Sequence, residues 1–303
     1  MNQFIALPED LDTVRMLHFL TKSYDGLNRY ITSTKNRIQH LKQEERAKRD
    51  ERIVKPLESI KGKLSRDIES QLFPFYIYRN WLKDIPGVGP WIAAALIKEY
   101  YYRFVPLCKK CGADMPEMPK GGNGADGEKR KAWKCIKCGA KAKGEGIIES
   151  RIERKDFPKI SSWWSYMGMG VVDGKKDRVK SGESKGGRRG RAIAYQLGEQ
   201  FIKQNGEHPY RAFYDRVKAK RERTHPDASK LHKHNMAKHE AAKLFLAHFW
   251  MVARELEGLE VTEPYAGKLL KHNVIQPYFW DSSQPTDVCH TKIESHYNFA
   301  SQA

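Results

Sequence analysis

Two short cysteine motifs constrain this chain more than any other feature of its sequence. Cys108 and Cys111 in CKKCG, and Cys135 and Cys138 in CIKCG, repeat one C-x-x-C-G pattern, with 23 residues between the inner cysteines. Each motif brings two thiolates to one ion, its glycine relieves the turn, and four thiolates in tetrahedral geometry select zinc. Four cysteine ligands keep no open position for water, so the pattern predicts a structural Zn²⁺ site in a small β zinc ribbon, not a catalytic one.

The ribbon, over residues 105–146, is expected to depend on its metal. The segment is too small to bury a core of its own, so metal binding would contribute on the order of 10 kcal/mol to its order. Between the motifs the chain reads PKGGNGADGEKRKAWK, a flexible basic tip suited to nucleic acid. The fifth cysteine, Cys289, belongs to neither motif and is expected to have no special role.

The charge balance indicates which partners the chain favours. Lys and Arg number 55 against 37 Asp and Glu, which gives a net charge of +18 and a pI of about 9.6. Such an excess favours a polyanion, most often nucleic acid, although a soluble basic surface with no such partner is the alternative. No apolar run approaches the roughly 20 residues that span a membrane, and MNQFIALPEDLD has no signal-peptide pattern. We therefore expect a cytoplasmic, nucleoid-associated protein with reduced cysteines and no membrane contact.

Helical periodicity dominates the rest of the chain, so the predicted fold class is mainly α. Apolar residues recur at steps of four, seven and three from Leu27 to Leu41 and at steps of three and four from Leu57 to Leu72, with Pro56 between the two sets. This pattern predicts two long helices, or one helix interrupted near Pro56, over residues 1–72. The narrow stripe with charged flanks is typical of a coiled-coil arm that makes a homo-oligomer, and a solvated lone helix is the alternative.

A bare turn separates two further predicted helices in residues 73–104. Ile85-Pro86-Gly87-Val88-Gly89 has the form of the hairpin in a helix-hairpin-helix element. Gly87 and Gly89 tolerate positive φ and leave room for a close approach, and the free amides of the following helix can bind a phosphate. This contact would involve Gly87, Val88 and Gly89 and would position DNA without reading its sequence. The alternative is an ordinary turn in which Ile85 and Val88 fill a core.

A basic, glycine-rich loop follows in residues 174–191, GKKDRVKSGESKGGRRGR. One interpretation is a linker that coats nucleic acid nonspecifically. The other is a site where a serine hydroxyl attacks a phosphodiester and arginines stabilise the developing charge. Its cations, all candidates for phosphate binding, are Lys175, Lys176, Arg178, Lys180, Lys185, Arg188, Arg189 and Arg191.

Two smaller groups of residues also have competing interpretations. His225, His232, His234 and His239 can belong to a second metal site or to a basic face directed at phosphate, and the interleaved lysines favour the latter. Trp163, Trp164 and Tyr166 can stack on bases, but adjacent tryptophans in an apolar segment favour a place in the core.

Four segments occur in the order of a known family: IPGVGPWIAAALIKEY, FPKISSWWSYMGMGVV, KSGESKGGRRGRAIAYQL and HNMAKHEAAKLFLAHFWMVARE. They resemble the C-terminal domain of the RuvC-like DEDD insertion-sequence transposases, the family that includes RNA-guided recombinases. The resemblance covers roughly residues 75 to 265, and the arm resembles the coiled coil that precedes that domain. It implies transposase or site-specific recombinase activity in DNA transposition, with a serine of a Ser-Gly pair as nucleophile. Ser181 of Ser181-Gly182 matches that pair, with Ser184 as the second candidate.

The family's RuvC-like domain, whose four acidic residues hold divalent metal, has no counterpart in these 303 residues. The resemblance therefore implies Mg²⁺ only with a separately encoded RuvC-like partner, and it leaves a guide RNA possible. The alternative is a non-catalytic, zinc-ribbon DNA- or RNA-binding protein derived from a transposase. The expected organisation is an arm (1–72), the start of a transposase-type domain (73–104), an inserted ribbon (105–146), the rest of that domain (147–276) and a tail (277–303).

Overall fold

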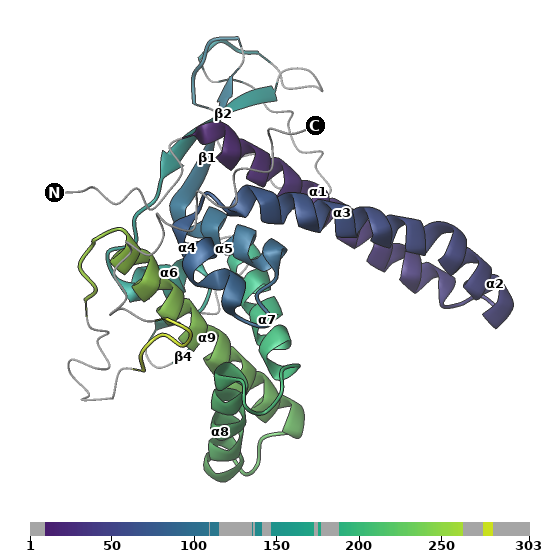
Figure 1. The fold of residues 1–303 in the computed structure, drawn as a ribbon, viewed down its shortest axis with the longest axis vertical. Coiled ribbons are helices and arrows are strands. Elements are labelled where there is room, and N and C mark those ends of the chain that lie inside the picture. Colours follow the sequence, from purple (N-terminus) through teal and green to yellow (C-terminus); the bar gives the residue numbers. More distant parts are fainter. Residues whose placement is uncertain are drawn as a thin grey trace, which may run out of the picture.

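The computed structural model describes residues 10–108, 110–114, 135, 137–140, 147–172, 175–176, 188–262 and 275–280. Helices make up most of these residues and only two short two-stranded sheets occur among them, which confirms the mainly α class. Figure 1 shows a helical body with three projections: a long helical arm, a β stem and a second helical hairpin. No helix in the described ranges is long and apolar enough to cross a membrane.

The arm consists of α1 (Leu11–Ile38) and a returning helical stretch beside it. That stretch is formed by α2 (Gln43–Arg49), the π-helix η1 (Asp50–Val54) and α3 (Lys55–Leu72), and α2 lies at the far tip in Figure 1. The Asp10 side chain starts α1 by accepting hydrogen bonds from the amides of Asp12 and Thr13. The two long helices predicted from the sequence are present, and they pack against each other.

The chain reverses at residues 39–42 and not near Pro56, where the sequence predicted the interruption. Pro56 lies in the first turn of α3, directly after the π-helix. A proline inside a helix removes one hydrogen bond and its ring clashes with the carbonyl four residues before. The wider π turn, in which the Lys55 amide bonds to the Asp50 carbonyl, lets the helix continue past the proline.

Burial along the arm is uneven. Near the body, Val14 and Leu17 of α1 and Ile68 and Leu72 of α3 are fully buried. Farther out, Ile60 remains 48% exposed. The inner half of the arm is therefore part of the main core, whereas in the outer half Ile31 of α1 and Val54 of η1 are buried outside that core, where α1 and η1 contact each other.

The body is built from short and long helices around an aromatic core. It contains α4 (Tyr76–Asn80), the 3₁₀ turn η2 (Leu82–Asp84), α5 (Pro90–Tyr101), α6 (Ile160–Tyr166), α7 (Arg188–Ile202), α8 (Pro209–Thr224) and α9 (Lys230–Leu256). Ala93, Ala94 and Ala95 of α5 are completely buried, and their small side chains allow neighbouring helices to approach closely. Trp81 stacks on Phe245 of α9 at 5.5 Å, and Trp163 and Trp250 are also fully buried.

The β stem grows directly out of α5. β1 (Tyr102–Cys108) begins at the residue after α5 ends, and it pairs antiparallel with β2 (Ile147–Arg154), with Phe104 opposite Ile152. The amide of Lys155 bonds to the Tyr101 carbonyl at 2.9 Å, which fixes the base of the stem to the end of α5. A second pair, β3 (Val171–Val172) and β4 (Lys175–Lys176), follows α6.

Candidate metal centre and nucleic-acid interface

The four cysteines of the two motifs meet at the outer end of the β stem. The sulfur atoms of Cys108 and Cys138 lie 3.6 Å apart, as do those of Cys111 and Cys135. All four sulfurs lie within 4.8 Å of one another, so the cluster can hold a metal ion as the spacing predicted. Four cysteine sulfurs at this separation form the donor set that favours a tetrahedral, thiophilic ion.

The two motifs have the same backbone geometry. The Gly112 amide bonds to the Cys108 carbonyl at 2.7 Å, and the Gly139 amide bonds to the Cys135 carbonyl at 2.9 Å. Gly112 has φ of +65° and Gly139 has φ of +71°, in the left-handed region that favours glycine. The glycine that ends each C-x-x-C-G motif is therefore required by the turn that aims the two thiols.

The surroundings of the four thiols do not allow all of them to ionise in the absence of a cation, because the pKa values of Cys135 and Cys111 shift in opposite directions. The backbone amides of Cys138 and Lys137 lower the pKa of Cys135, which favours its thiolate. The Ala113 amide has the same effect on Cys111, but desolvation and the three neighbouring sulfurs outweigh it and raise the pKa of Cys111. A divalent cation would supply the charge that allows all four thiols to ionise together.

The two glycines of the bare turn have different surroundings. Gly87 has φ of +92°, and a Cβ there would come within 3.0 Å of the Gln204 side-chain nitrogen and 3.3 Å of the Gln200 Cβ. This glycine is needed for the turn and for close packing on the end of α7. A Cβ on Gly89 would meet nothing within 4 Å, so this side of the turn is open. Val88 between them is buried and fills the core, as the alternative interpretation expected.

The open side of the turn is also the start of α5. Gly89 is the residue before the helix and offers no side chain to cap it, and Pro90 occupies the first position. The amides of the first turn after Pro90 therefore have no side-chain cap, which is the arrangement that attracts a phosphate. Contact with phosphate at Gly87, Val88 and Gly89 stays a prediction, and only the Gly89 side has space for it.

Most of the predicted basic loop lies outside the described residues. This applies to both candidate nucleophiles, Ser181 and Ser184, and to Arg178, Lys180 and Lys185. Lys175 and Lys176 form β4, and Arg188 is the first residue of α7. The two ends of the loop are thus placed on secondary structure, while the serine mechanism stays a prediction.

Arg189 lies between two carboxylates. Its guanidinium forms ion pairs with Asp25 of α1 at 3.2 Å and with Glu99 of α5 at 3.0 Å. Glu99 also accepts a hydrogen bond from the Tyr166 hydroxyl at 2.6 Å, and Asp25 accepts one from the Trp91 indole at 2.7 Å. A phosphate would have to displace these carboxylates to reach Arg189.

The first turn of α7 packs tightly against the turn after α6. A Cβ on Gly190 would lie 2.8 Å from the Met167 Cα. A Cβ on Gly168, which has φ of +69°, would lie 2.3 Å from the Arg191 Cγ, so the Arg191 stem rests on this glycine. The downstream end of the basic loop is therefore firmly anchored in the body.

A buried lysine lies near Arg189, and no sequence motif marks this lysine as functional. Lys98 of α5 is 3% exposed, and its ammonium group donates to the Thr21 hydroxyl of α1 at 2.7 Å. Burial, reinforced by the nearby Arg189 charge, lowers the pKa of Lys98 to about 7. Its position four residues after the buried Ala94, in an alanine-rich helix, was the available sign that it faces the core.

The aromatic segment belongs to the core. Trp163 is fully buried and packs edge-on against Tyr100 at 5.1 Å. Trp164 is half-buried, and its indole donates to the Lys243 carbonyl at 3.2 Å. This placement agrees with the structural interpretation of these tryptophans.

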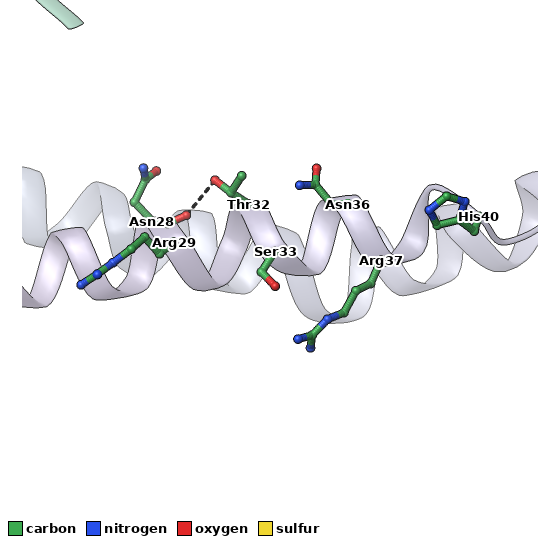
Figure 2. A pocket seen from close by; sticks show the side chains of 7 residues that line it. All are labelled: Asn28, Arg29, Thr32, Ser33, Asn36, Arg37 and His40. Atoms are coloured by element: carbon green, nitrogen blue, oxygen red, sulfur yellow. Dashed lines mark hydrogen bonds between the residues drawn. The ribbon is translucent and has the colours of Figure 1, made fainter. Parts of the chain in front are cut away.

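The described residues also form one open depression, along the outer half of α1 (Figure 2). Its lining comes from that helix and from His40 in the turn after it, in a polar row at four-residue spacing beside a second row that contains Arg29, Ser33 and Arg37. Thr32 donates to the Asn28 carbonyl at 2.9 Å, so part of the row is satisfied locally. The depression has no paired acid and base and gives no reason to assign chemistry to it. The chain matches no protein-family model, no curated protein and no solved structure.

Proposed function

We propose that this chain binds the sugar–phosphate backbone of nucleic acid and acts on DNA as a transposase- or recombinase-like protein. The observation that carries the proposal is the net charge of +18, because so large an excess repels itself unless a polyanion neutralises it. The open Gly89 side of the α5 start supports backbone contact. The ordered set of family-like segments is the reason to name DNA transposition.

Zn²⁺ is the ion we assign to the four-cysteine cluster, in a structural role. Four soft thiolates fit zinc, and none of the four positions is left for a substrate or a water molecule. The metal would fix the outer end of the ribbon and so the placement of its basic tip. The outer arm, where Tyr30 is 56% exposed and Ile60 is 48% exposed, is our candidate for contact with a second copy of the chain.

Binding to duplex DNA is expected to weaken steeply with salt. Each phosphate that the protein neutralises contributes about 0.9 to the negative slope of log affinity against log salt concentration. Fluorescence anisotropy with a labelled duplex, measured across a series of salt concentrations, gives that slope directly. A nearly flat response would contradict the proposal and the charge argument behind it.

The same assay tests the start of α5. Gly89→Ala adds a methyl group where nothing in the described protein is within 4 Å, so the fold should tolerate it while a phosphate would be displaced. We expect about a five-fold loss of affinity, close to 1 kcal/mol. Gly26→Ala, at an exposed glycine of α1 with equally open surroundings, is the matched control and should bind as the unchanged protein does.

The catalytic part of the proposal predicts a covalent intermediate. The Ser181 hydroxyl would attack a phosphorus atom, form a phosphoserine ester, and release a deoxyribose hydroxyl that takes up the proton. Incubation of protein, a RuvC-like partner with Mg²⁺ and substrate DNA should then give a protein–DNA adduct on a denaturing gel. Ser181→Ala should abolish the adduct, or Ser184→Ala should do so if Ser184 is the nucleophile. Ser162→Ala, at an exposed serine of α6, is the control and should leave adduct formation unchanged.

Adduct formation that survives both the Ser181→Ala and the Ser184→Ala changes would exclude the serine mechanism. Salt-dependent binding without any adduct, with every candidate partner tried, would favour the second function: a non-catalytic protein that grips DNA or RNA. That alternative needs only the net positive charge and the four-cysteine cluster.

A further inference from the structure

The hairpin of α8 and α9 is the third projection from the body (Figure 1). Between Pro209 and Glu240 it carries nine Lys and Arg against four Asp and Glu, together with four histidines. The hairpin lies apart from the β stem and from the arm. Its charge therefore needs an explanation of its own.

Three cations of α8 lie together on one exposed flank of the helix. Tyr210, Tyr214 and Val217 are buried and hold α8 against the rest of the protein. Arg216, Lys220 and Arg223 are exposed and follow at steps of four and three residues, so they share one flank of the helix. We call these three residues the α8 stripe. The two acids of α8, Asp215 and Glu222, are seven residues apart and lie on a different flank.

The α8 stripe has no acidic partner, unlike its neighbours. Arg211 pairs with Asp215 at 2.8 Å, Arg221 pairs with Glu240, and Lys238 pairs with Glu199 at 2.5 Å. Among the residues that the structure describes, none forms an ion pair with the α8 stripe. The Arg216 guanidinium lies 5.6 Å from the centre of the Phe213 ring, which leaves its charge without an acidic partner among these residues. The three cations of the α8 stripe are thus exposed to solvent without an acidic partner among the described residues, whereas Arg211, Arg221 and Lys238 form ion pairs.

The stripe is also held in a fixed geometry. Pro209 starts α8, the helix packs on α9 along its length, and the Ser229 side chain caps α9 by accepting from the His232 amide. Seven residues of helix span about 10.5 Å. One strand of B-DNA carries a charge about every 3.4 Å along the axis, so the stripe matches about three successive phosphates.

We propose that the α8 stripe docks on the phosphate backbone of double-stranded nucleic acid. This surface lies on a different helix from the start of α5 and from the start of α7, and the inference rests on the proposed function. A duplex fits better than a single strand because the stripe offers no exposed aromatic ring on which unpaired bases can stack. It fits better than an anionic membrane because the apolar face of α8 is already used against the protein, and an interfacial helix needs that face free.

The test replaces the three cations with glutamine, which keeps the helix and removes the charge. The Arg216→Gln, Lys220→Gln and Arg223→Gln changes are combined in the full-length, zinc-loaded chain. The matched control removes three equally exposed, unpaired cations at the arm tip through Lys42→Gln, Arg46→Gln and Lys48→Gln. Both proteins are titrated with a labelled duplex of arbitrary sequence over a range of salt concentrations, and circular dichroism checks that both are folded.

We expect the stripe variant to reduce the slope of log affinity against log salt by about 2.7, which is 0.9 for each of three phosphates. The arm-tip control should keep the original slope. An unchanged slope in the stripe variant, or an equal reduction in both variants, would overturn the assignment while nucleic-acid binding itself survived. If the unchanged protein fails to bind duplex at all, the proposed function is wrong, and the assignment of the α8 stripe as a duplex-binding surface is wrong as well.

A further comparison separates the two polyanions. Vesicles that contain about a third phosphatidylserine are offered to the same proteins in a sedimentation assay. Duplex binding that depends on the stripe, with little vesicle binding, supports the proposal. Vesicle binding that depends on the stripe, with duplex binding unaffected, would overturn it in favour of a membrane surface.

Discussion

Removal of the metal is expected to unfold the ribbon and to leave the helical body intact. Among the residues that the structure describes, the cluster at the outer end of the stem consists of the four cysteines with Ala113 and Ala140, and it is separate from the main core. Metal binding in such a site contributes on the order of 10 kcal/mol, and nothing apolar in the cluster replaces it. A chelator, or Cys135→Ser, should therefore make the two cysteine motifs accessible to protease, while far-ultraviolet circular dichroism and the thermal unfolding of the body barely change.

The fifth cysteine provides the control for this experiment. Cys289→Ser changes a thiol that belongs to neither motif, so it should keep one zinc per chain by elemental analysis and the protease resistance of the ribbon. A protein that is free of metal and still resists protease across the ribbon would contradict the assignment. Loss of helical signal on chelation would contradict the independence of the body from the ribbon.

Replacing the buried lysine is expected to stabilise the protein. Burial lowers the pKa of Lys98 to about 7 from its ordinary value of 10.5, so its protonated form is disfavoured in the folded state. Between these two pH values the unfolded chain binds a proton that the folded chain does not, and the free energy of unfolding therefore rises with pH. Over the whole window the gain is roughly 3–5 kcal/mol for this one group. Lys98→Met should raise stability at pH 7, and Thr21 should keep its hydrogen bond to the His18 carbonyl.

Urea unfolding at pH 7 and at pH 9.5 measures both parts of this expectation. Lys155 titrates in the same range, because burial lowers its pKa to about 8, so the informative quantity is the difference between the variant and the unchanged protein. That difference should be large at pH 7 and should shrink as the pH rises. Lys63→Met, at an exposed lysine of α3, should change stability little at either pH. A Lys98→Met protein that is less stable at pH 7 would show that the lysine is held charged by its surroundings.

The features that were predicted well are those written in local sequence. The cysteine spacing determined which four sulfurs meet, because each motif is a self-contained turn. The mainly helical class followed from the periodicity of apolar residues, because that spacing is a local property of the chain. The position of the arm reversal was wrong because a proline normally ends a helix, and a π-helix that compensates for it has no simple sequence signature.

The features that were missed depend on contacts between distant segments. Lys98 meets Thr21 across 77 positions of sequence, and Arg189 meets Asp25 and Glu99 from two different helices. The spacing of Arg216, Lys220 and Arg223 is visible in the sequence. The side of α8 that carries Tyr210 and Tyr214 packs against the protein, and the opposite flank faces solvent. The sequence of α8 alone does not show which of its sides is buried.

The direct passage from α5 into β1 gives the ribbon a fixed aim. No linker separates Tyr101 of α5 from Tyr102 of β1, and the Lys155 amide bonds back to the Tyr101 carbonyl. The stem is therefore a rigid extension of the body. The outer end of the stem, where the four cysteine sulfurs meet, is consequently held at a set distance and in a set direction from the end of α5.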